Sequence, residues 1–142
     1  MILLNTPSMA LQKAHNTILK ADPVLTQFVN KRVFDDIPRG SEFPYIQIGD
    51  SQDIDNGNTC DSSPTEVFCR IHIWVRGPQR GIVADQIAHQ VRKLLADDSI
   101  VLDDYVITVA NFVSTDTTME QNELEIHSVV TLRYLLQGIY VP

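Results

Sequence analysis

The sequence predicts an α+β fold in which an antiparallel β-sheet of about four strands carries two main helices on one face. Two segments repeat apolar residues every three to four positions, as one face of a helix requires, and three others alternate between apolar and polar residues. A further extended segment is rich in β-branched residues. The segments follow one another in the order α-β-β-α-β-β, and the short connections favour antiparallel pairs. At 142 residues, the chain is expected to form one domain over residues 1–142.

The first helix is predicted to begin after Thr6 or Ser8, since either side chain can cap the amino terminus of a helix. Its apolar face is formed by Leu11, Ala14, Ile18 and Leu19. The dipeptide Asp22-Pro23 interrupts this helix, because proline disfavours helical geometry in the residue before it. A short helical turn over residues 23–30 then offers further apolar side chains to the core.

The stretch from Val33 to Pro44 is predicted to be an architectural turn that leads into the sheet. Val33 and Phe34 can form a brief extended piece. The residues that supply turn chemistry are Asp35, Asp36, Pro38 and Gly40. We expect the two aspartates to hold the bend and Pro44 to start the first main strand, where a missing amide costs least.

Residues 50–64 are predicted to form a long, mobile loop, because they are polar, acidic and nearly free of apolar side chains. The carboxylates expected to contact a partner protein are Asp50, Asp53, Asp55 and Asp61. Asp53 and Asp55 also match the start of a calcium-binding loop, but Gly57 stands where the third ligand belongs. An acidic, solvated loop is therefore the better interpretation.

The segment from Glu66 to Arg76 gives the strongest strand signal, because apolar residues alternate along its whole length. Its predicted core face carries Val67, Cys69, Ile71, Ile73 and Val75, and its other face carries Glu66, Phe68, Arg70, His72, Trp74 and Arg76. Aromatic residues and arginine are enriched at protein interfaces. The candidate oligomer or partner interface is therefore Phe68, Arg70, Trp74 and Arg76, and an ordinary amphipathic surface is the alternative.

The second half of the chain is predicted to contain one helix and two strands. Pro78 suits the first position of the helix, whose apolar stripe covers residues 82–95. Strands are predicted at residues 105–113 and 123–134, with Leu124, Ile126, Val130 and Leu132 pointing inward. The polar loop between them, residues 114–122, is expected to be mobile and to bind a partner through Asp116 and Glu120. A tail over residues 138–142 provides a second candidate interface patch, formed by Ile139, Tyr140 and Val141.

Motifs that carry chemistry are missing from the sequence. It contains neither a GxSxG nucleophile motif nor a glycine-rich phosphate loop. Cys69 is expected in the core, and Cys60 is expected as an exposed thiol in the polar loop. The histidines are isolated in sequence, although His72 and His127 fall on the outer faces of their strands and could meet across the sheet. We therefore expect no catalytic residue, metal or cofactor, and the chain is predicted not to be an enzyme.

The net charge of the chain is −7, from 11 Lys and Arg against 18 Asp and Glu. This balance argues against a protein that grips a phosphate backbone, which requires clustered Lys and Arg. The amino-terminal residues lack the basic region and long apolar core of a signal peptide, and no apolar run approaches the ~20 residues that span a bilayer. The chain is expected to be soluble and intracellular, without a membrane partner.

Four segments, taken in order, resemble a known protein family. They are RVFDDIP (residues 32–38), FPYIQIG (43–49), IHIWVR (71–76) and a helical pattern that begins at Gly81. The other positions of that pattern are Ile87, Ala88, Val91 and Leu94, with Asp85 where a small residue is often seen. From about residue 11 to residue 136, the chain resembles the tail completion proteins of long-tailed bacteriophages. Relatives also occur in prophages and in phage-like gene transfer particles.

The resemblance implies a structural virion protein, similar in fold to tail terminators. Such proteins form a ring, commonly hexameric, that caps the head-proximal end of the tail tube. The implied partners are further copies of the chain, the tail tube protein and a head-completion or connector protein, while DNA passes through without specific binding. The implied location is the head–tail junction of the virion, after assembly in the host cytoplasm. Another head–tail connector component, a stopper or adaptor, is the alternative, and a small enzyme or binding module is a weaker one.

Overall fold

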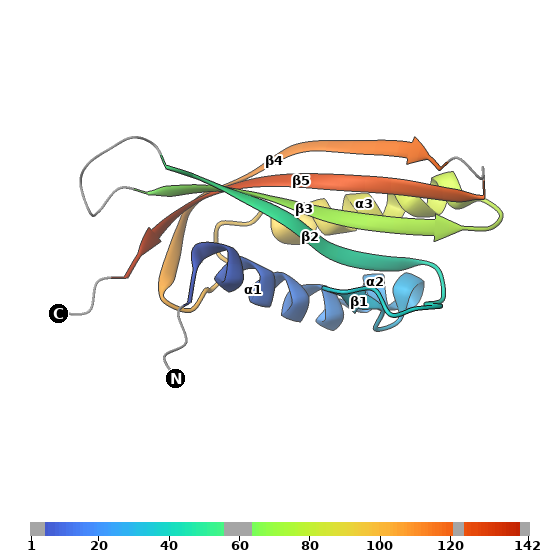
Figure 1. The fold of residues 1–142 in the computed structure, drawn as a ribbon, viewed down its shortest axis with the longest axis horizontal. Helices are drawn as coiled ribbons and strands as arrows, with labels where there is room; N and C mark the ends of the chain where they lie inside the picture. Colours follow the sequence, from blue (N-terminus) through green and yellow to red (C-terminus); the bar gives the residue numbers. More distant parts are fainter. Residues whose placement is uncertain (1–4, 56–63, 121–123, 140–142) are drawn as a thin grey trace.

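The computed structural model describes residues 5–55, 64–120 and 124–139, which form one layer of helices on one face of a twisted sheet (Figure 1). The elements are α1 (Pro7–Ala21), α2 (Pro23–Val29), β1 (Val33–Phe34), β2 (Tyr45–Asp55), β3 (Thr65–Arg76), α3 (Arg80–Leu95), β4 (Tyr105–Met119) and β5 (Glu125–Gly138). The strand order across the sheet is β1-β2-β3-β5-β4, and all pairs except β1–β2 are antiparallel. The predicted α+β class is confirmed.

The number and order of the elements differ from the prediction of four strands and two main helices. The described chain has five strands and three helices. The short segment after Asp22 forms a full helix, because the Asp22 carboxylate caps it by accepting a hydrogen bond from Leu25 N at 2.9 Å. Val33 and Phe34 count as a strand because they pair in parallel with Ile46 and Gln47.

The helices follow the predicted apolar pattern with one correction at α3. Thr6 caps α1, accepting a hydrogen bond from Met9 N at 3.2 Å. The helix α3 begins at Arg80 and not at Pro78. The backbone is left-handed at Gly77, with φ 103°, and at Gln79, with φ 59°. Pro78 therefore lies in the turn that precedes the helix.

Strands β2 and β4 extend into both segments that the sequence predicted as mobile loops. After a register shift between Gly49 and Ser51, β2 continues to Asp55 by pairing with the first half of β3. In the same way β4 continues to Met119 by pairing with β5. The backbone hydrogen bonds of a strand form with its neighbour whatever side chains the strand carries. The polar composition of these two segments therefore did not mean that they form loops.

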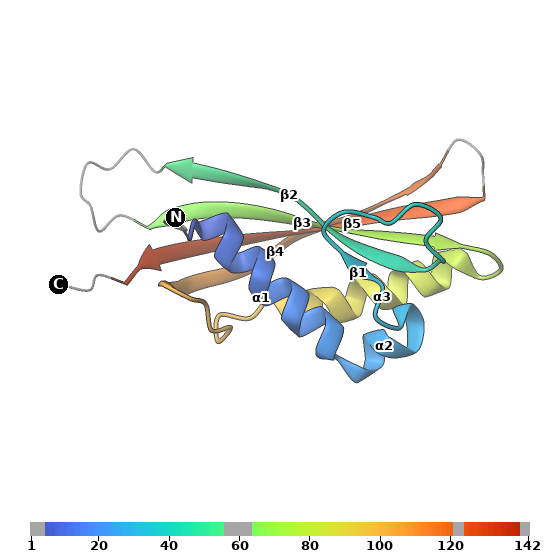
Figure 2. The same ribbon diagram turned by 60° about the horizontal axis from the view of Figure 1, so that its bottom comes forward.

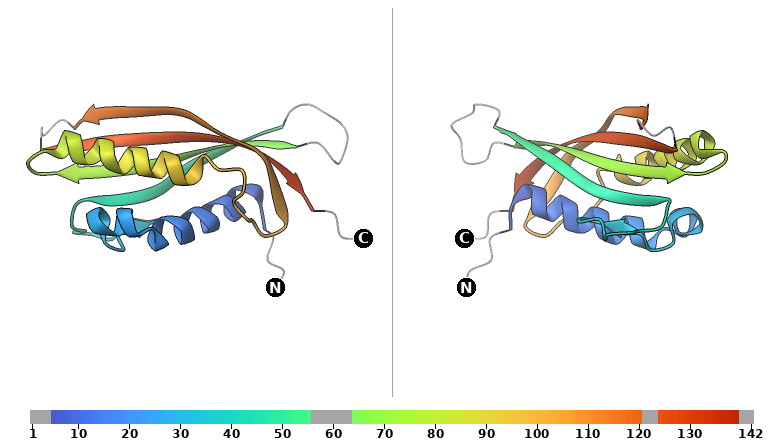
Figure 3. Two further views of the ribbon diagram at one scale, coloured as in Figure 1. Left: turned by 180° about the vertical axis from the view of Figure 1, so that it is seen from behind. Right: turned by 45° about the vertical axis from the view of Figure 1, so that its right-hand side comes forward.

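The core lies between the sheet and the three helices (Figures 2 and 3). All five residues predicted on the core face of β3 are buried, from Val67 to Val75. On β5 the predicted inward residues Ile126, Val130 and Leu132 are buried too. Leu124 is the exception, since it precedes β5 and is 58% exposed. The opposite face of the sheet carries no helix from the described part of the chain, as Figure 2 shows.

Candidate functional site

The open face of the sheet, opposite the helices, brings together the four residues of the predicted β3 interface. Phe68, Arg70, Trp74 and Arg76 alternate along β3 with the buried core residues and so share this face. Their neighbours across the sheet follow from the strand register. Trp74 pairs with Tyr45 of β2 on one side and with His127 of β5 on the other.

Aromatic rings form a continuous row at one end of the open face. The Trp74 indole stacks on the His127 imidazole, with ring centroids 3.8 Å apart and planes 6° from parallel. On its other side Trp74 stacks with Tyr45 at 6.4 Å, and Tyr45 contacts Phe43 at 5.0 Å. The Arg76 guanidinium lies 4.5 Å from the centre of the Phe43 ring. Tyr45 is buried within the subunit, at 8% exposure, whereas Phe43, Trp74 and His127 are partly exposed. These three rings are flat, rigid side chains of the kind that protein interfaces use.

Beside the aromatic row, four polar side chains form a chain across the sheet. His72 Nε2 lies 3.0 Å from Asp50 Oδ1, and His72 Nδ1 lies 2.7 Å from His127 Nε2. His127 Nδ1 lies 3.5 Å from Glu120 Oε1. The hydrogen bond with His72 holds the pKa of the Asp50 carboxyl below its ordinary value, with a smaller contribution from Arg70. Burial lowers the pKa of His127, and the charge of His72 acts in the same direction while Glu120 opposes it.

The arginines of the open face are matched by carboxylates of the same subunit. Arg133 Nη2 lies 2.6 Å from Glu66 Oε2, and Arg70 lies 3.7 Å from Asp50. Arg76 is paired with Glu125. The Arg70–Asp50 pair is exposed, and pairs of that kind typically contribute about 0–1 kcal/mol, whereas the Arg133–Glu66 pair is part-buried. These pairs leave the arginines of β3 and β5 partnered within the subunit.

The remaining predicted interface and loop residues lie apart from this row. Asp53 points to the helix side, where it accepts a hydrogen bond from Ser8 Oγ at 2.6 Å. Asp116 lies on β4 and accepts from Ser114 Oγ at 3.1 Å. Ile139 follows the end of β5 and is 52% exposed. Asp55 is the last residue of β2.

Three predicted site residues lie outside the described residues: Asp61, Tyr140 and Val141.

The predicted turn before β2 is present, and Arg32 makes the contacts that close it. Asp35 and Asp36 form a bend, and Pro38 accepts a backbone hydrogen bond from Ser41 at 3.2 Å. Arg32 Nε donates to the Pro44 carbonyl at 2.9 Å, just before β2 begins at Tyr45.

Sequence reasoning missed Phe43, Tyr45 and His127 as members of the aromatic row. The alternation of each strand shows which face a residue shares. Which residues stand opposite one another on neighbouring strands depends on the register of the pairing, and the alternation within one strand does not determine that register. The expectation that His72 and His127 could meet across the sheet is confirmed by the 2.7 Å contact.

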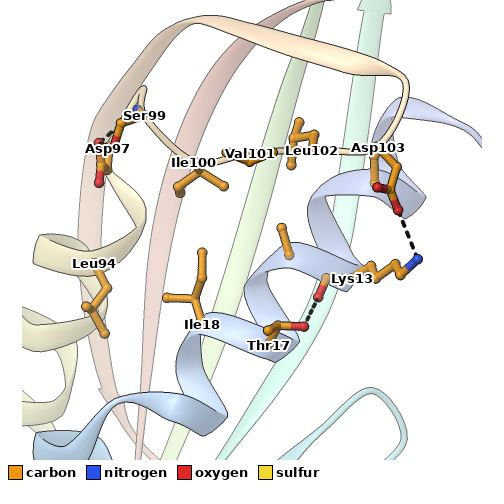
Figure 4. Close-up of a pocket in the computed structure, with 12 residues that line it drawn as sticks. Lys13, Thr17, Ile18, Leu94, Asp97, Ser99, Ile100, Val101, Leu102 and Asp103 are labelled. Carbon is orange, nitrogen blue, oxygen red and sulfur yellow. Dashed lines mark hydrogen bonds and ion pairs between the residues drawn. The ribbon is translucent and has the colours of Figure 1, made fainter.

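A groove of about 470 Å³ lies on the helix side, between α1 and residues 97–103 (Figure 4). Its floor is apolar, with Ile18, Leu94 and Ile100 facing one another. The polar groups at its rim are engaged with each other, since Lys13 binds Asp103 at 2.9 Å and Asp97 accepts from Ser99. The groove therefore offers shape and apolar area but no set of converging free polar groups.

Within residues 5–55, 64–120 and 124–139, no helix combines the length and apolar character that a membrane crossing needs. In the same ranges, no three His, Cys, Asp or Glu side chains are grouped so that they could hold a metal ion.

Comparisons with known proteins agree with this architecture. The chain resembles a protein in the virion of a native gene transfer agent particle, with a TM-score of 0.82 and 21% identity over 91% of this chain and 96% of the other. It also resembles the gp17 protein of bacteriophage SPP1, with a TM-score of 0.59 and 20% identity over 94% of this chain and 91% of the other. At these identities the two structures establish the fold. No curated protein matches the chain in sequence.

The family follows from a separate comparison of the sequence. The model of the family described as tail completion protein gp17 matches residues 16–137, which is most of the chain. This range includes all the strands of the open face up to Gln137. The chain therefore belongs to the tail completion protein gp17 family, whose members are structural proteins of phage tails.

Proposed function

We propose that this chain is a tail terminator, which caps the head-proximal end of the tail tube as a ring of identical subunits, six in number, and joins the tail to the head connector. The observation that carries the proposal is the open sheet face with its aromatic row, in a chain of the tail completion family. A sheet normally covers an aromatic face with a second layer. A neighbouring subunit or tail protein provides that layer in the proposed assembly.

The positions of the two candidate patches suit a ring. Ring closure requires one patch on a subunit to meet a different patch on the next. Trp74 pairs with His127 near the start of β5, whereas Ile139 follows the end of the same strand. At the rise of an extended strand, these two places are about 40 Å apart, so they cannot meet within one subunit. A contact between them joins neighbouring subunits head to tail.

The edges of the sheet add a second means of contact. Strand β4 forms one edge over 15 residues, with no further strand paired to it in the described chain. Several of its apolar side chains are half exposed, among them Val106 and Val113. An edge of this length exposes unpaired backbone donors and acceptors, and proteins normally cover such edges.

The charge of the chain suits a channel through which DNA moves. Each subunit carries a net charge of −7, and six would carry −42. A phosphate backbone is repelled by such a surface, so the lumen would let DNA pass without holding it.

Tube capping in vitro tests this proposal. The tail tube protein of the same particle is polymerised with and without the chain, and tube lengths are measured by electron microscopy. A terminator shortens the tubes in proportion to its concentration and is found at one end only. Binding to the portal-side connector without any effect on tube length would instead identify a stopper or adaptor, and binding to neither would reject both roles.

A further inference from the structure

Three ring protons satisfy every contact of the four linked side chains Asp50, His72, His127 and Glu120. Both ends are carboxylates, so His72 Nε2 carries the proton of its 3.0 Å hydrogen bond with Asp50. His127 Nδ1 lies 3.5 Å from Glu120, and a proton on this nitrogen makes that contact an ion pair. The central contact of 2.7 Å between His72 Nδ1 and His127 Nε2 needs one proton between two nitrogens. Three ring protons on two imidazoles give one imidazole and one imidazolium.

Fewer or more protons break a contact. With two protons, both hydrogen bonds of His72 remain, but a bare His127 Nδ1 faces the Glu120 carboxylate at 3.5 Å. With four, two N–H groups point at each other across 2.7 Å, and two positive charges stand side by side. The rings must then separate, which moves His127 relative to the Trp74 indole that lies 3.8 Å from it.

The groups around the pair favour one positive charge and oppose a second. Asp50 of β2 and Glu120 at the end of β4 face it with negative charge, and Arg70 beside His72 on β3 adds a positive charge 3.7 Å from Asp50. The Arg76–Glu125 pair lies next along the same face and is balanced within itself. Thr118 stands opposite His127 on β4 and carries no charge. The π-face of Trp74 attracts a single imidazolium.

Gly49 makes the contact between His72 and Asp50 possible. A Cβ atom at this position would lie 2.5 Å from His72 Cδ2 and 2.8 Å from Nε2, closer than atoms can approach. Any side chain at residue 49 would push the imidazole away from Asp50. The bulge between Gly49 and Ser51 and the missing side chain together place the Asp50 carboxylate against the ring.

We propose that His72 and His127 form a proton-sensitive latch on the open face of the sheet. One shared positive charge ties β2, β3, β5 and the end of β4 together and holds His127 flat against Trp74. Uptake of a second proton drives the two rings apart and changes the surface around Trp74. The latch belongs to the isolated chain, and it holds whether or not the chain forms a ring.

Nitrogen-15 NMR of histidine-labelled protein tests the latch directly. In a pH titration we expect a state in which three of the four ring nitrogens of His72 and His127 are protonated, with a scalar coupling across the N–H···N hydrogen bond. On acidification the fourth proton should appear and the coupling should vanish. The fluorescence of Trp74, the single tryptophan of the chain, should change at the same pH while the far-ultraviolet circular dichroism stays native.

Two matched pairs of variants locate the effect. His127→Gln should abolish both the coupling and the fluorescence transition, whereas the exposed His89→Gln should keep both. Gly49→Ala should abolish the coupling, whereas Gly81→Ala, whose Cβ would meet only Ile126 at an ordinary 3.8 Å, should keep it. The proposal would be overturned by the absence of any pH at which three ring protons and the coupling occur together. An unchanged Trp74 signal when the fourth proton binds, or unfolding before it binds, would overturn it as well.

Discussion

The Tyr134 hydroxyl donates a hydrogen bond to the Leu95 carbonyl at 2.7 Å, and the same oxygen lies 2.9 Å from His15 Nε2. Because the hydroxyl proton is given to a carbonyl, which only accepts, the His15 ring must donate through Nε2. This junction joins α1, the end of α3 and β5 inside the core, and both His15 and Tyr134 have 0% exposure. It ties α1 and the end of α3 to β5 and so holds these two helices against the sheet.

Removal of the Tyr134 hydroxyl should destabilise the protein strongly. Tyr134→Phe leaves the Leu95 carbonyl and the His15 N–H buried without their partner, so the free energy of unfolding should fall by about 2–4 kcal/mol. Tyr105→Phe is the matched control, because that hydroxyl is part-buried and donates to Asn5 O at 2.8 Å. Its cost should be about 1 kcal/mol. Urea denaturation measures both, and equal costs would contradict the role of the junction.

Acid should destabilise the protein through His15. Burial lowers the pKa of His15 from 6.5 to about 4, so below pH 6.5 the unfolded chain binds a proton that the folded chain refuses. The stability contribution is therefore complete above pH 6.5 and falls as the pH approaches about 4, by about 3 kcal/mol in total. His15→Gln keeps a donor for Tyr134 and cannot titrate, so its stability should change less over the same range. An identical pH dependence in both proteins, measured by urea denaturation, would contradict this assignment.

The thiol of Cys69 should be inert in the folded protein. Burial raises its pKa to about 12, so almost no thiolate forms at neutral pH. The variant Cys60→Ser contains Cys69 as its single cysteine. We expect no reaction with a thiol reagent at pH 8 in the native state and complete reaction in denaturant. Rapid labelling of the native variant would show that β3 is more accessible than the structure places it.

Loss of the Trp74 ring should weaken assembly more than folding. Trp74 is only partly buried in the subunit, so Trp74→Ala should lower the free energy of unfolding by about 1–2 kcal/mol. In the proposed ring, the Trp74→Ala variant would lack the indole ring that a neighbouring subunit covers. Aromatic side chains of this kind often contribute most of the binding energy of an interface. Val101→Ala is a suitable control, because Val101 is 89% exposed on the helix side. Sedimentation velocity should show fewer oligomers for Trp74→Ala alone, and normal assembly of this variant would place the interface elsewhere.

The sequence allowed most of the fold to be predicted where apolar periodicity was strong. The core face of β3 was predicted at the level of single residues, and the cap of α1 was predicted as Thr6 or Ser8, of which Thr6 is the one found. The ends of β2 and β4 were not, because residues 51–55 and 114–119 are polar and are held in the sheet by pairing with β3 and β5. Cross-strand contacts such as Tyr45 with Trp74 depend on register, which alternation alone cannot supply. The roles of the predicted interface residues stay predictions.

Assembly into a closed ring is the central claim, and mass measurement tests it most directly. Light scattering over a concentration series, with negative-stain images of the largest species, should give closed rings of six subunits with a central hole wide enough for duplex DNA. If the chain alone stays monomeric, tube protein is added as a template and the rings are sought at tube ends. A strict monomer at every concentration, both alone and with tube protein present, would contradict the account.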